Sequence, residues 1–354
     1  MSRSFFPGGN TPGGFFSYFG EIAREGERTL CLKGASGSGK ATFMKKAAAA
    51  FAARGCPVEY FWCSNDPASL DGIRVPGART CIVDGTAPHV QDPALPVARD
   101  MLFDMAAFID PAAVQPHREE LARLSRTKKE CCARAYAYLA AAWALHQDSA
   151  RLRGQFLDRG KLNACILEAL GLFDGTGSPG KTGHTRRFFA DALTPEGFVN
   201  TLDSLTDLDT VVVLRGEPGM GTDAFLEHMQ RAAGLRGLDT ERLCRPLDPG
   251  APEHLIVPEL RLGFFTQNRL CRARFPAHAR EIQFSDFIHG LETHSGALNY
   301  NEAMFDLLTG KAVQTLAAQR AAHGRMEEIY IEGMDFDGLN RACEEMIARL
   351  VAGL

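Results

Sequence analysis

The chain has 354 residues, which is enough for two or three domains with buried cores. Its hydrophobic fraction of 45% and charged fraction of 23% are typical of globular proteins, and a net charge of −4 provides no basic field for nucleic acid. We expect no membrane segment, because the N-terminus lacks a signal-peptide hydrophobic region and the longest apolar helical run, residues 135–145, is too short for a bilayer.

The opening segment carries the aromatic residues Phe15, Phe16 and Phe19 shortly after Thr11 and Pro12. Threonine is a common N-cap and proline fits the first turn, so this pattern predicts a helix that begins at Thr11. At helical spacing the aromatic side chains favour a place in the core over stacking on a base.

Residues 34–42 read GASGSGKAT and lie between an apolar run, 29–32, and a strong helix former, 43–53. Strand, glycine-rich loop and helix in this order are typical of a phosphate-binding loop, whose backbone amides point at phosphate oxygens. Lys40 would contact the β- and γ-phosphates. The predicted nucleotide-binding residues are Gly34, Ser36, Gly37, Ser38, Gly39, Lys40, Ala41 and Thr42.

One position of this loop departs from the usual pattern. The residue after the lysine is normally serine or threonine, whose hydroxyl binds magnesium, and here it is Ala41, with Thr42 one place late. The sequence therefore predicts nucleotide binding and leaves competence in hydrolysis open.

Residues 80–84, TCIVD, form an apolar run that ends in a carboxylate. This is typical of a second strand at a phosphate site, and Asp84 would hold magnesium there. His89, in the loop that follows, could transfer a proton or could be an ordinary hydrogen-bonded loop residue. Asp66 and Asp71 could position water or a substrate, although both also stand in common turn-forming pairs.

The ten cysteines show no C-x-x-C pair and no metal-type spacing with histidine. Cys31 and Cys81 fall in expected strands, where cysteine is usually a small buried hydrophobe. Reduced thiols predict a cytoplasmic protein.

The chain repeats itself at an offset of about 182 residues. The matching pairs are Phe5-Phe6 with Phe188-Phe189, Gly34 and Gly39 with Gly216 and Gly221, Asp66-Pro67 with Asp248-Pro249, and Val75-Pro76 with Val257-Pro258. A domain-sized period predicts two copies of one α/β domain. Each copy would have a mainly parallel sheet flanked by helices and a long helical extension, near residues 111–148 and 301–323.

The predicted organisation is an N-terminal nucleotide-binding domain, 1–174, a Gly/Ser/Pro linker, 175–185, and a degenerate second copy, 186–354. The linker contains GTGSPGKT at 175–182, which fits the phosphate-loop pattern. We reject it as a binding site because residues 162–172 before it look helical and no helix start follows it.

The second copy has lost the charged residues of the first. Its loop, residues 216–223, reads GEPGMGTD and has Thr222 in place of the lysine, and Thr266 stands in place of Asp84. We therefore expect a structural or regulatory domain. We also expect the two copies to pair as an intramolecular pseudo-dimer, with Arg215 or Arg261 facing the first site.

Four runs together resemble an uncharacterised bacterial family of duplicated P-loop ATPase-like proteins. They are CSNDPASLDG (63–72), IVDGTAPHVQDP (82–93), NTPGGF (10–15) and MDFDGLN (334–340). The resemblance covers nearly the whole chain and implies tandem P-loop NTPase domains that bind ATP. Ala41 and Thr222 depart from the family's pattern. These two departures concern the expected activity and do not change the expected fold.

The leading hypothesis is hydrolysis of a nucleoside triphosphate, ATP or GTP, with Mg²⁺ at one site in the first copy. Lys40 and the loop amides would hold the phosphates, and Asp84 the metal. The alternatives are a small-molecule kinase, with its acceptor near Asp66 and His89, and a nucleotide-gated binding module without turnover.

Overall fold

The computed structural model describes residues 2–23, 27–88, 90–178 and 180–352. The chain forms two compact units. Unit 1 contains Met1–Gly8, Ser17–Arg134 and Gln314–Leu354, and unit 2 contains Gly9–Phe16 and Ala135–Val313.

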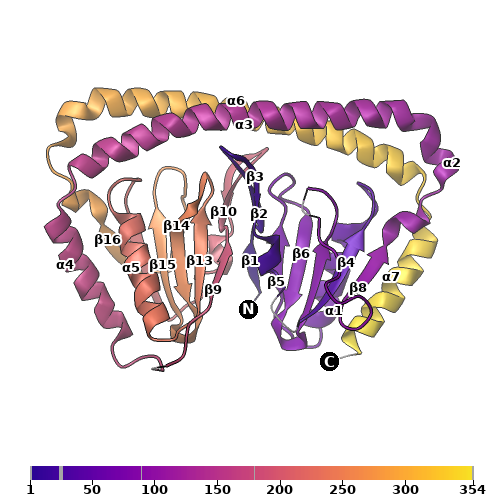
Figure 1. Ribbon diagram of the computed structural model, residues 1–354, viewed down its shortest axis with the longest axis horizontal. Coiled ribbons are helices and arrows are strands. Elements are labelled where there is room, and N and C mark those ends of the chain that lie inside the picture. The colour runs from indigo at the N-terminus through magenta and orange to yellow at the C-terminus, as the bar shows by residue number, and fades with distance from the viewer. Residues whose placement is uncertain (1, 24–26, 89, 179, 353–354) are drawn as a thin grey trace. The chain divides into compact units, whose positions relative to one another are not determined.

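Unit 1 is built on a mixed sheet of six strands (Figure 1). In spatial order the strands are β1 (Arg3–Phe5), β5 (Glu59–Trp62), β6 (Leu70–Val75), β7 (Thr80–Asp84), β4 (Arg28–Lys33) and β8 (Met101–Asp104). Only β6 runs antiparallel to its neighbours, β5 and β7. The carboxyl ends of β4 and β7 therefore meet at one edge of the sheet, where ligands bind in open α/β folds.

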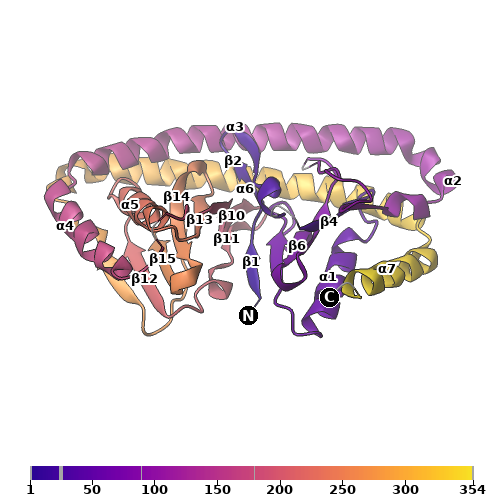
Figure 2. The same ribbon diagram turned by 60° about the horizontal axis from the view of Figure 1, so that its bottom comes forward.

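Two helices share the main core of unit 1. α1 (Lys40–Ala52) contributes Phe43 and Phe51, and α7 (Phe336–Val351) contributes Leu339 and Leu350, to one buried cluster with β4, β6 and β7. Figure 2 shows α7 beside α1. α1 forms readily because it is rich in alanine, and its N-terminus follows directly from the glycine loop.

Unit 2 repeats this topology. Its six strands are, in spatial order, β9 (Thr185–Phe188), β13 (Thr240–Arg245), β14 (Asp248–Val257), β15 (Leu262–Gln267), β12 (Thr210–Arg215) and β16 (Arg280–Gln283). Here β14 is the antiparallel strand. α5 (Thr222–Leu235) and α4 (Arg159–Leu170) cover the core. The matching strand orders confirm the internal repeat.

Two long helices carry the chain between the units. α3 (Arg118–Gln155) follows the short α2 (Pro111–Val114) and passes from unit 1 into unit 2, and α6 (Ser295–Glu332) returns to unit 1. A single shift of 177 residues takes both ends of α3 to those of α6, because 295 − 118 and 332 − 155 both equal 177. The first copy therefore ends in α4, which packs in unit 2, and the second copy ends in α7, which packs in unit 1.

The compact units consequently do not coincide with the contiguous domains 1–174 and 186–354 that the sequence predicts. Residues 135–174, with α4, belong to unit 2, and Gln314–Leu354, with α7, belongs to unit 1. Sequence order alone cannot show this exchange, because the two terminal helices have similar apolar faces and each could cover either sheet.

The predicted helix at Thr11 is wrong. β2 (Gly8–Thr11) and β3 (Gly14–Ser17) form a hairpin, as do β10 (Asp191–Thr194) and β11 (Gly197–Asn200). The Thr11 hydroxyl accepts a hydrogen bond from the Gly13 amide at 3.2 Å, and Gly14 has φ +112°. Turn chemistry at Pro12-Gly13-Gly14 therefore outweighs the capping signal.

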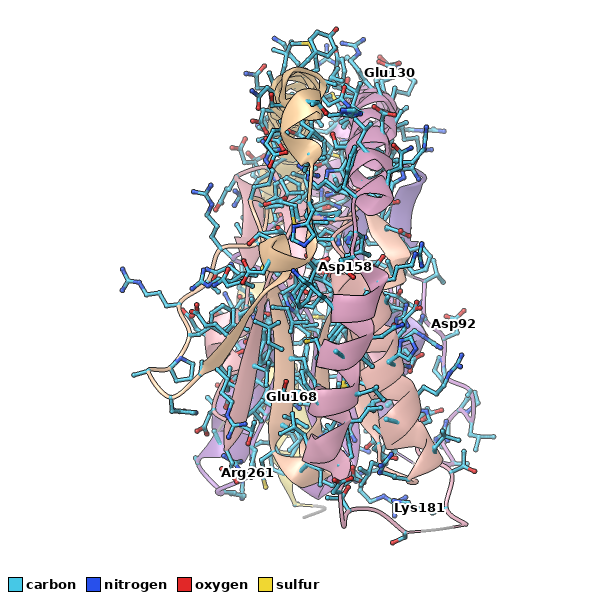
Figure 3. All side chains as sticks on the ribbon, turned by 90° about the vertical axis from the view of Figure 1, so that its left-hand side faces the viewer. Asp92, Glu130, Asp158, Glu168, Lys181 and Arg261 are labelled. Atoms are coloured by element: carbon cyan, nitrogen blue, oxygen red, sulfur yellow. The ribbon has the colours of Figure 1, made fainter. Side chains whose placement is uncertain are left out.

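The GTGSPGKT run at 175–182 lies between a helix and a strand, as we expected when we rejected it as a phosphate-binding loop. α4 precedes it, and strand β9, not a helix, follows it; Pro179 lies outside the described residues. Figure 3 shows Asp158 at the start of α4, Glu168 along it, and Lys181 on the loop beyond. Over the described part of the chain, no helix has both the length and the apolar character needed to cross a bilayer.

The packing of α7 in unit 1 can be tested with Leu339→Ala. Leu339 is buried in the core, so we expect this change to lower the free energy of unfolding of unit 1 by about 2–5 kcal/mol. Urea unfolding followed by Trp62 fluorescence in a Trp143→Phe background reports on unit 1, because Trp143 lies in unit 2.

Leu167→Ala is the matched control, because Leu167 is 69% exposed on α4. It should change the stability by no more than about 0.5 kcal/mol. Equal effects of the two substitutions would contradict the packing of α7 in this core.

Candidate functional site

The glycine loop of unit 1, Gly34–Gly39, joins β4 directly to α1. Gly37 and Gly39 have φ of +75° and +84°, which side chains with a Cβ rarely adopt. Among the described residues, the backbone amides of Gly37, Gly39 and Lys40 find no acceptor. The predicted context of strand, loop and helix is confirmed, and it leaves amide donors at a helix N-terminus, where anions are favoured.

Lys40 lies across the mouth of this loop. Its Nζ donates to the carbonyls of Ala35 at 2.8 Å and Gly34 at 3.2 Å, and lies 3.8 Å from Asp84 Oδ2. Only 11% of the lysine side chain and 14% of the aspartate side chain are exposed. The structure thus brings together the two residues for which the sequence predicts phosphate and metal contacts.

Asp84 is held at the end of β7 by the loop that follows it. Its Oδ1 accepts hydrogen bonds from the amide and the hydroxyl of Thr86, at 2.9 and 2.5 Å. Asp71, on β6, lies near it in the same cavity. Burial, and then the negative charge of Asp84, raise the pKa of Asp71 to about 8.

A cavity of about 570 Å³ opens over the glycine loop, and we call it the loop cavity. Its volume lies within the usual range for small-molecule sites. The Oγ of Ser38 and the Oε1 of Gln319 line it and are buried without a hydrogen-bond partner among the described residues. A ligand in the cavity could satisfy these groups and the free loop amides.

The far side of the loop cavity is formed by the long helices. Lys128 comes from α3, and Arg320, His323 and Glu327 come from α6. Lys128 Nζ donates to His323 Nδ1 at 2.6 Å, and Arg320 Nη2 lies 2.7 Å from Asp66 Oδ1. A Cβ on Gly37 would stand 3.0 Å from the Glu327 carbonyl, so α6 lies directly against the loop.

Burial and the neighbouring cations set the protonation of this side of the cavity. Burial, then Lys128 and Lys40, lower the pKa of His323 to about 4, so its ring is neutral near pH 7. Burial also lowers the pKa of Lys128. Burial, then the charge of Asp66, raise the pKa of Glu327.

The structure collects most of the predicted site residues in one place. All eight predicted loop residues from Gly34 to Thr42 line the loop cavity, as do Asp66, Asp71 and Asp84. Ala41 also packs against the core of unit 1 and offers no oxygen ligand. His89 lies outside the described residues.

Sequence reasoning missed the four helix residues on the far side. Lys128, Arg320, His323 and Glu327 lie far from the loop in the chain and carry no local pattern. The one signal in the sequence that could have pointed to these residues is the internal repeat, because it shows that α3 and α6 are equivalent helices of the two copies.

The corresponding loop of unit 2, Gly216–Gly221, keeps the backbone conformation of the first loop and lacks the charged residues of the candidate site. Gly219 and Gly221 have φ of +91° and +99°, as in unit 1. Thr222 is buried, and the Glu217 carboxylate accepts a hydrogen bond from the Arg269 amide at 2.8 Å. The polar cavity beside Glu217 holds only about 10 Å³, which is too little for a nucleotide. The predicted arginines pair within unit 2, Arg215 with Glu281 and Arg261 with Asp209.

A second polar cluster lies buried in unit 2, where Asp191, His254 and Cys271 come together. The Thr266 amide donates to His254 Nδ1 at 3.0 Å, so the proton of the neutral ring is on Nε2, which donates to Asp191 Oδ2 at 2.7 Å. A metal-binding histidine usually donates a proton through its other nitrogen. This hydrogen bonding therefore favours a structural role for the cluster.

Comparison with known proteins identifies no relative: no family model, no curated protein and no solved structure matches this chain.

The raised pKa of Asp71 predicts a pH-dependent loss of stability. Between about pH 4 and pH 8 the folded protein keeps a proton on Asp71 that the unfolded chain has released, so the free energy of unfolding falls as pH rises through this window. Asp71→Asn removes this contribution. Urea unfolding at pH 5 and pH 8 should show a smaller decrease in stability for the variant than for the wild type.

Asp337→Asn provides the control, since Asp337 is exposed on α7. It should leave the difference between the two pH values unchanged. The same pH dependence in Asp71→Asn and the wild type would rule out a protonated Asp71 in the folded protein.

Proposed function

We propose that unit 1 binds a nucleoside triphosphate, ATP or GTP, in the loop cavity and hydrolyses it with Mg²⁺. The observation that supports this most directly is the meeting of Lys40 and Asp84 beside a loop with free amide donors. A cation, a carboxylate and oriented amides at a helix N-terminus suit a triphosphate and its metal. On this proposal unit 1 is a P-loop NTPase domain, and unit 2 is a degenerate copy with a structural or regulatory role.

Lys40 now satisfies its ammonium group with two loop carbonyls and Asp84. Phosphate oxygens would give it charge-assisted hydrogen bonds, which are about twice as strong as bonds to neutral acceptors. The amides of Gly37, Gly39 and Lys40 would donate to the same phosphates. Because these groups are already in position, little reorganisation accompanies binding or the reaction.

The residues around Asp84 fit a magnesium ion. Mg²⁺ commonly uses one or two carboxylates, with substrate phosphates and water completing its octahedral shell. Among the described residues, Asp84 Oδ2 accepts no hydrogen bond from the loop that follows β7. This arrangement requires no hydroxyl at position 41, where Ala41 stands. When bound, the ion would offset the charge on the phosphates.

A small-molecule kinase is the second candidate, with Asp66 and Asp71 lining the same cavity in which its acceptor would bind. A carboxyl group with a pKa of about 8 titrates near neutral pH, where it could accept the proton of an acceptor hydroxyl as well as that of a water molecule. A phosphate-release rate that rises sharply with one metabolite from a library would favour the kinase over the hydrolase.

Lys40→Ala tests the proposed function. Removing a charge-assisted hydrogen bond should weaken ATP binding about 10- to 100-fold and abolish most of the phosphate release. Binding is measured by isothermal titration calorimetry and turnover by steady-state phosphate release, both with magnesium.

Lys46→Ala serves as the matched control, because Lys46 is an exposed lysine on the same helix. It should behave as the wild type. ATP binding without release in the wild type would instead support the nucleotide-gated module. Undiminished ATP binding in Lys40→Ala would refute the proposed site.

Asp84→Asn tests the metal. The amide is a poorer magnesium ligand than the carboxylate, so turnover should fall while ATP binding in EDTA stays within about 3-fold of the wild type. An equal loss of ATP affinity in EDTA would assign Asp84 a role other than metal binding.

A further inference from the structure

Lys128 is a half-buried cation that lines the loop cavity and faces the glycine loop. Its Nζ donates to His323 Nδ1. Within the described part of the chain, no carboxylate lies within 4.0 Å of its ammonium group. Buried lysines are rare without a paired anion, because desolvation of the charge is costly.

His323 accepts a hydrogen bond from Lys128, but its neutral ring carries no negative charge to balance the ammonium group. An ammonium group only donates, so Nδ1 accepts, and the proton of the neutral ring faces Glu327 Oε1, 3.5 Å from Nε2. Apart from Lys128 and Glu327, the charged groups that influence the ring are Lys40, Asp66 and Asp84. The charge of Glu327 also acts on Lys128, from beyond 4.0 Å, so an anionic ligand could approach the ammonium group more closely.

The same histidine fixes where Lys128 lies relative to the loop. His323 Nδ1 is 3.4 Å from Ser36 Oγ, and the backbone of α6 at Glu327 lies against Gly37. Lys128 is thus held beside the part of the loop that precedes Lys40. The two lysines approach the loop cavity from different elements, α3 and the start of α1.

The internal repeat supplies an independent comparison. The shift that superimposes α3 on α6 places Phe305 at the position of Lys128 and His146 at the position of His323. In unit 2 these two rings pack together, with centroids 5.1 Å apart. Unit 2 thus retains the histidine and lacks both lysines, since Thr222 replaces Lys40. The joint presence of the lysines in one copy, and their joint loss in the other, indicates that they serve one function.

We propose that Lys128, positioned by His323, is a second lysine ligand for the terminal phosphate and makes the site prefer a triphosphate to a diphosphate. This inference rests on the proposed function, because it takes the loop cavity as the nucleotide site. A diphosphate would use the loop amides and Lys40. Only a triphosphate would also neutralise Lys128, and one charge-assisted hydrogen bond of this kind is worth about 10- to 100-fold in affinity.

The test compares two probes, ADP and a non-hydrolysable imido analogue of ATP, by isothermal titration calorimetry with magnesium. In the wild type the analogue should bind at least about 10-fold more tightly than ADP. Lys128→Met should weaken the analogue about 10- to 100-fold and change the affinity for ADP by less than about 3-fold. Lys129→Met, which removes the adjacent exposed lysine, should preserve the wild-type ratio.

Three outcomes would overturn the inference. If Lys128→Met keeps the wild-type ratio, or loses both ligands equally, Lys128 does not select the terminal phosphate, while the proposed function stands. If the wild type binds neither probe, the proposed function fails and this inference fails with it.

Two further measurements guard against a folding defect. The substitution removes a half-buried charge that has no carboxylate within 4.0 Å among the described residues, so the ligand-free variant should unfold at the same temperature as the wild type or a higher one. His323→Gln keeps Lys128 and disturbs its position, and it should lower the preference for the triphosphate analogue without eliminating ADP binding. An unchanged preference in His323→Gln would remove the positioning role of the histidine.

Discussion

The parallel pairing of β4 with β7 is the constraint on which the site depends. The register places Leu32 opposite Asp84, so the chain leaves β4 for the glycine loop at the level where the aspartate ends β7. The loop returns Lys40 to this same edge at the start of α1. A cation and an anion drawn from distant parts of the sequence are thereby held 3.8 Å apart by backbone hydrogen bonds. A register slip of one residue would turn Asp84 to the other face of the sheet.

The two copies differ in the polar residues at this edge of the sheet. In unit 1, Asp71 lies beside the Cys63 thiol, and burial raises the pKa of Asp71 to about 8. In unit 2 the equivalent positions carry Glu253 and Arg245, which form a buried ion pair at 2.7 Å. The cavity that Arg245 and Glu253 line holds only about 20 Å³. Buried side-chain atoms without a hydrogen-bond partner among the described residues occur in both units, among them Ser38 Oγ in unit 1 and Glu217 Oε2 in unit 2, but only in unit 1 do such atoms line a cavity large enough for a nucleotide.

The glycine loop, its flanking strand and helix, and the repeat could all be predicted from the sequence, because each depends on neighbouring residues or on a direct comparison of two segments. Lys40 and Asp84 belong to such local patterns. Lys128 and His323 do not, since their pairing depends on how two long helices pack. The hairpin at Thr11 was missed because Thr-Pro signals both a helix start and a turn, and the following glycines decide between the two.

The assignment of chain to compact units was also beyond local reasoning. α4 and α7 each follow a long helix and carry similar apolar residues, such as Leu162 and Leu339, which pack beside the glycine loops at Gly221 and Gly39. Helical periodicity shows that each helix has a face to bury and does not show which sheet receives it. The exchange becomes visible only when the contacts across the whole chain are known.

This exchange has a consequence for how the protein is made. The strands of unit 1 are translated before Ala135–Val313 of unit 2, whereas α7 and the half of α6 that borders the glycine loop are translated after it. Domains usually fold in order of synthesis. Here the core of unit 1 can close only after Gln314–Leu354 has also been synthesised. A prematurely terminated chain would therefore contain the complete glycine loop and still lack a finished site.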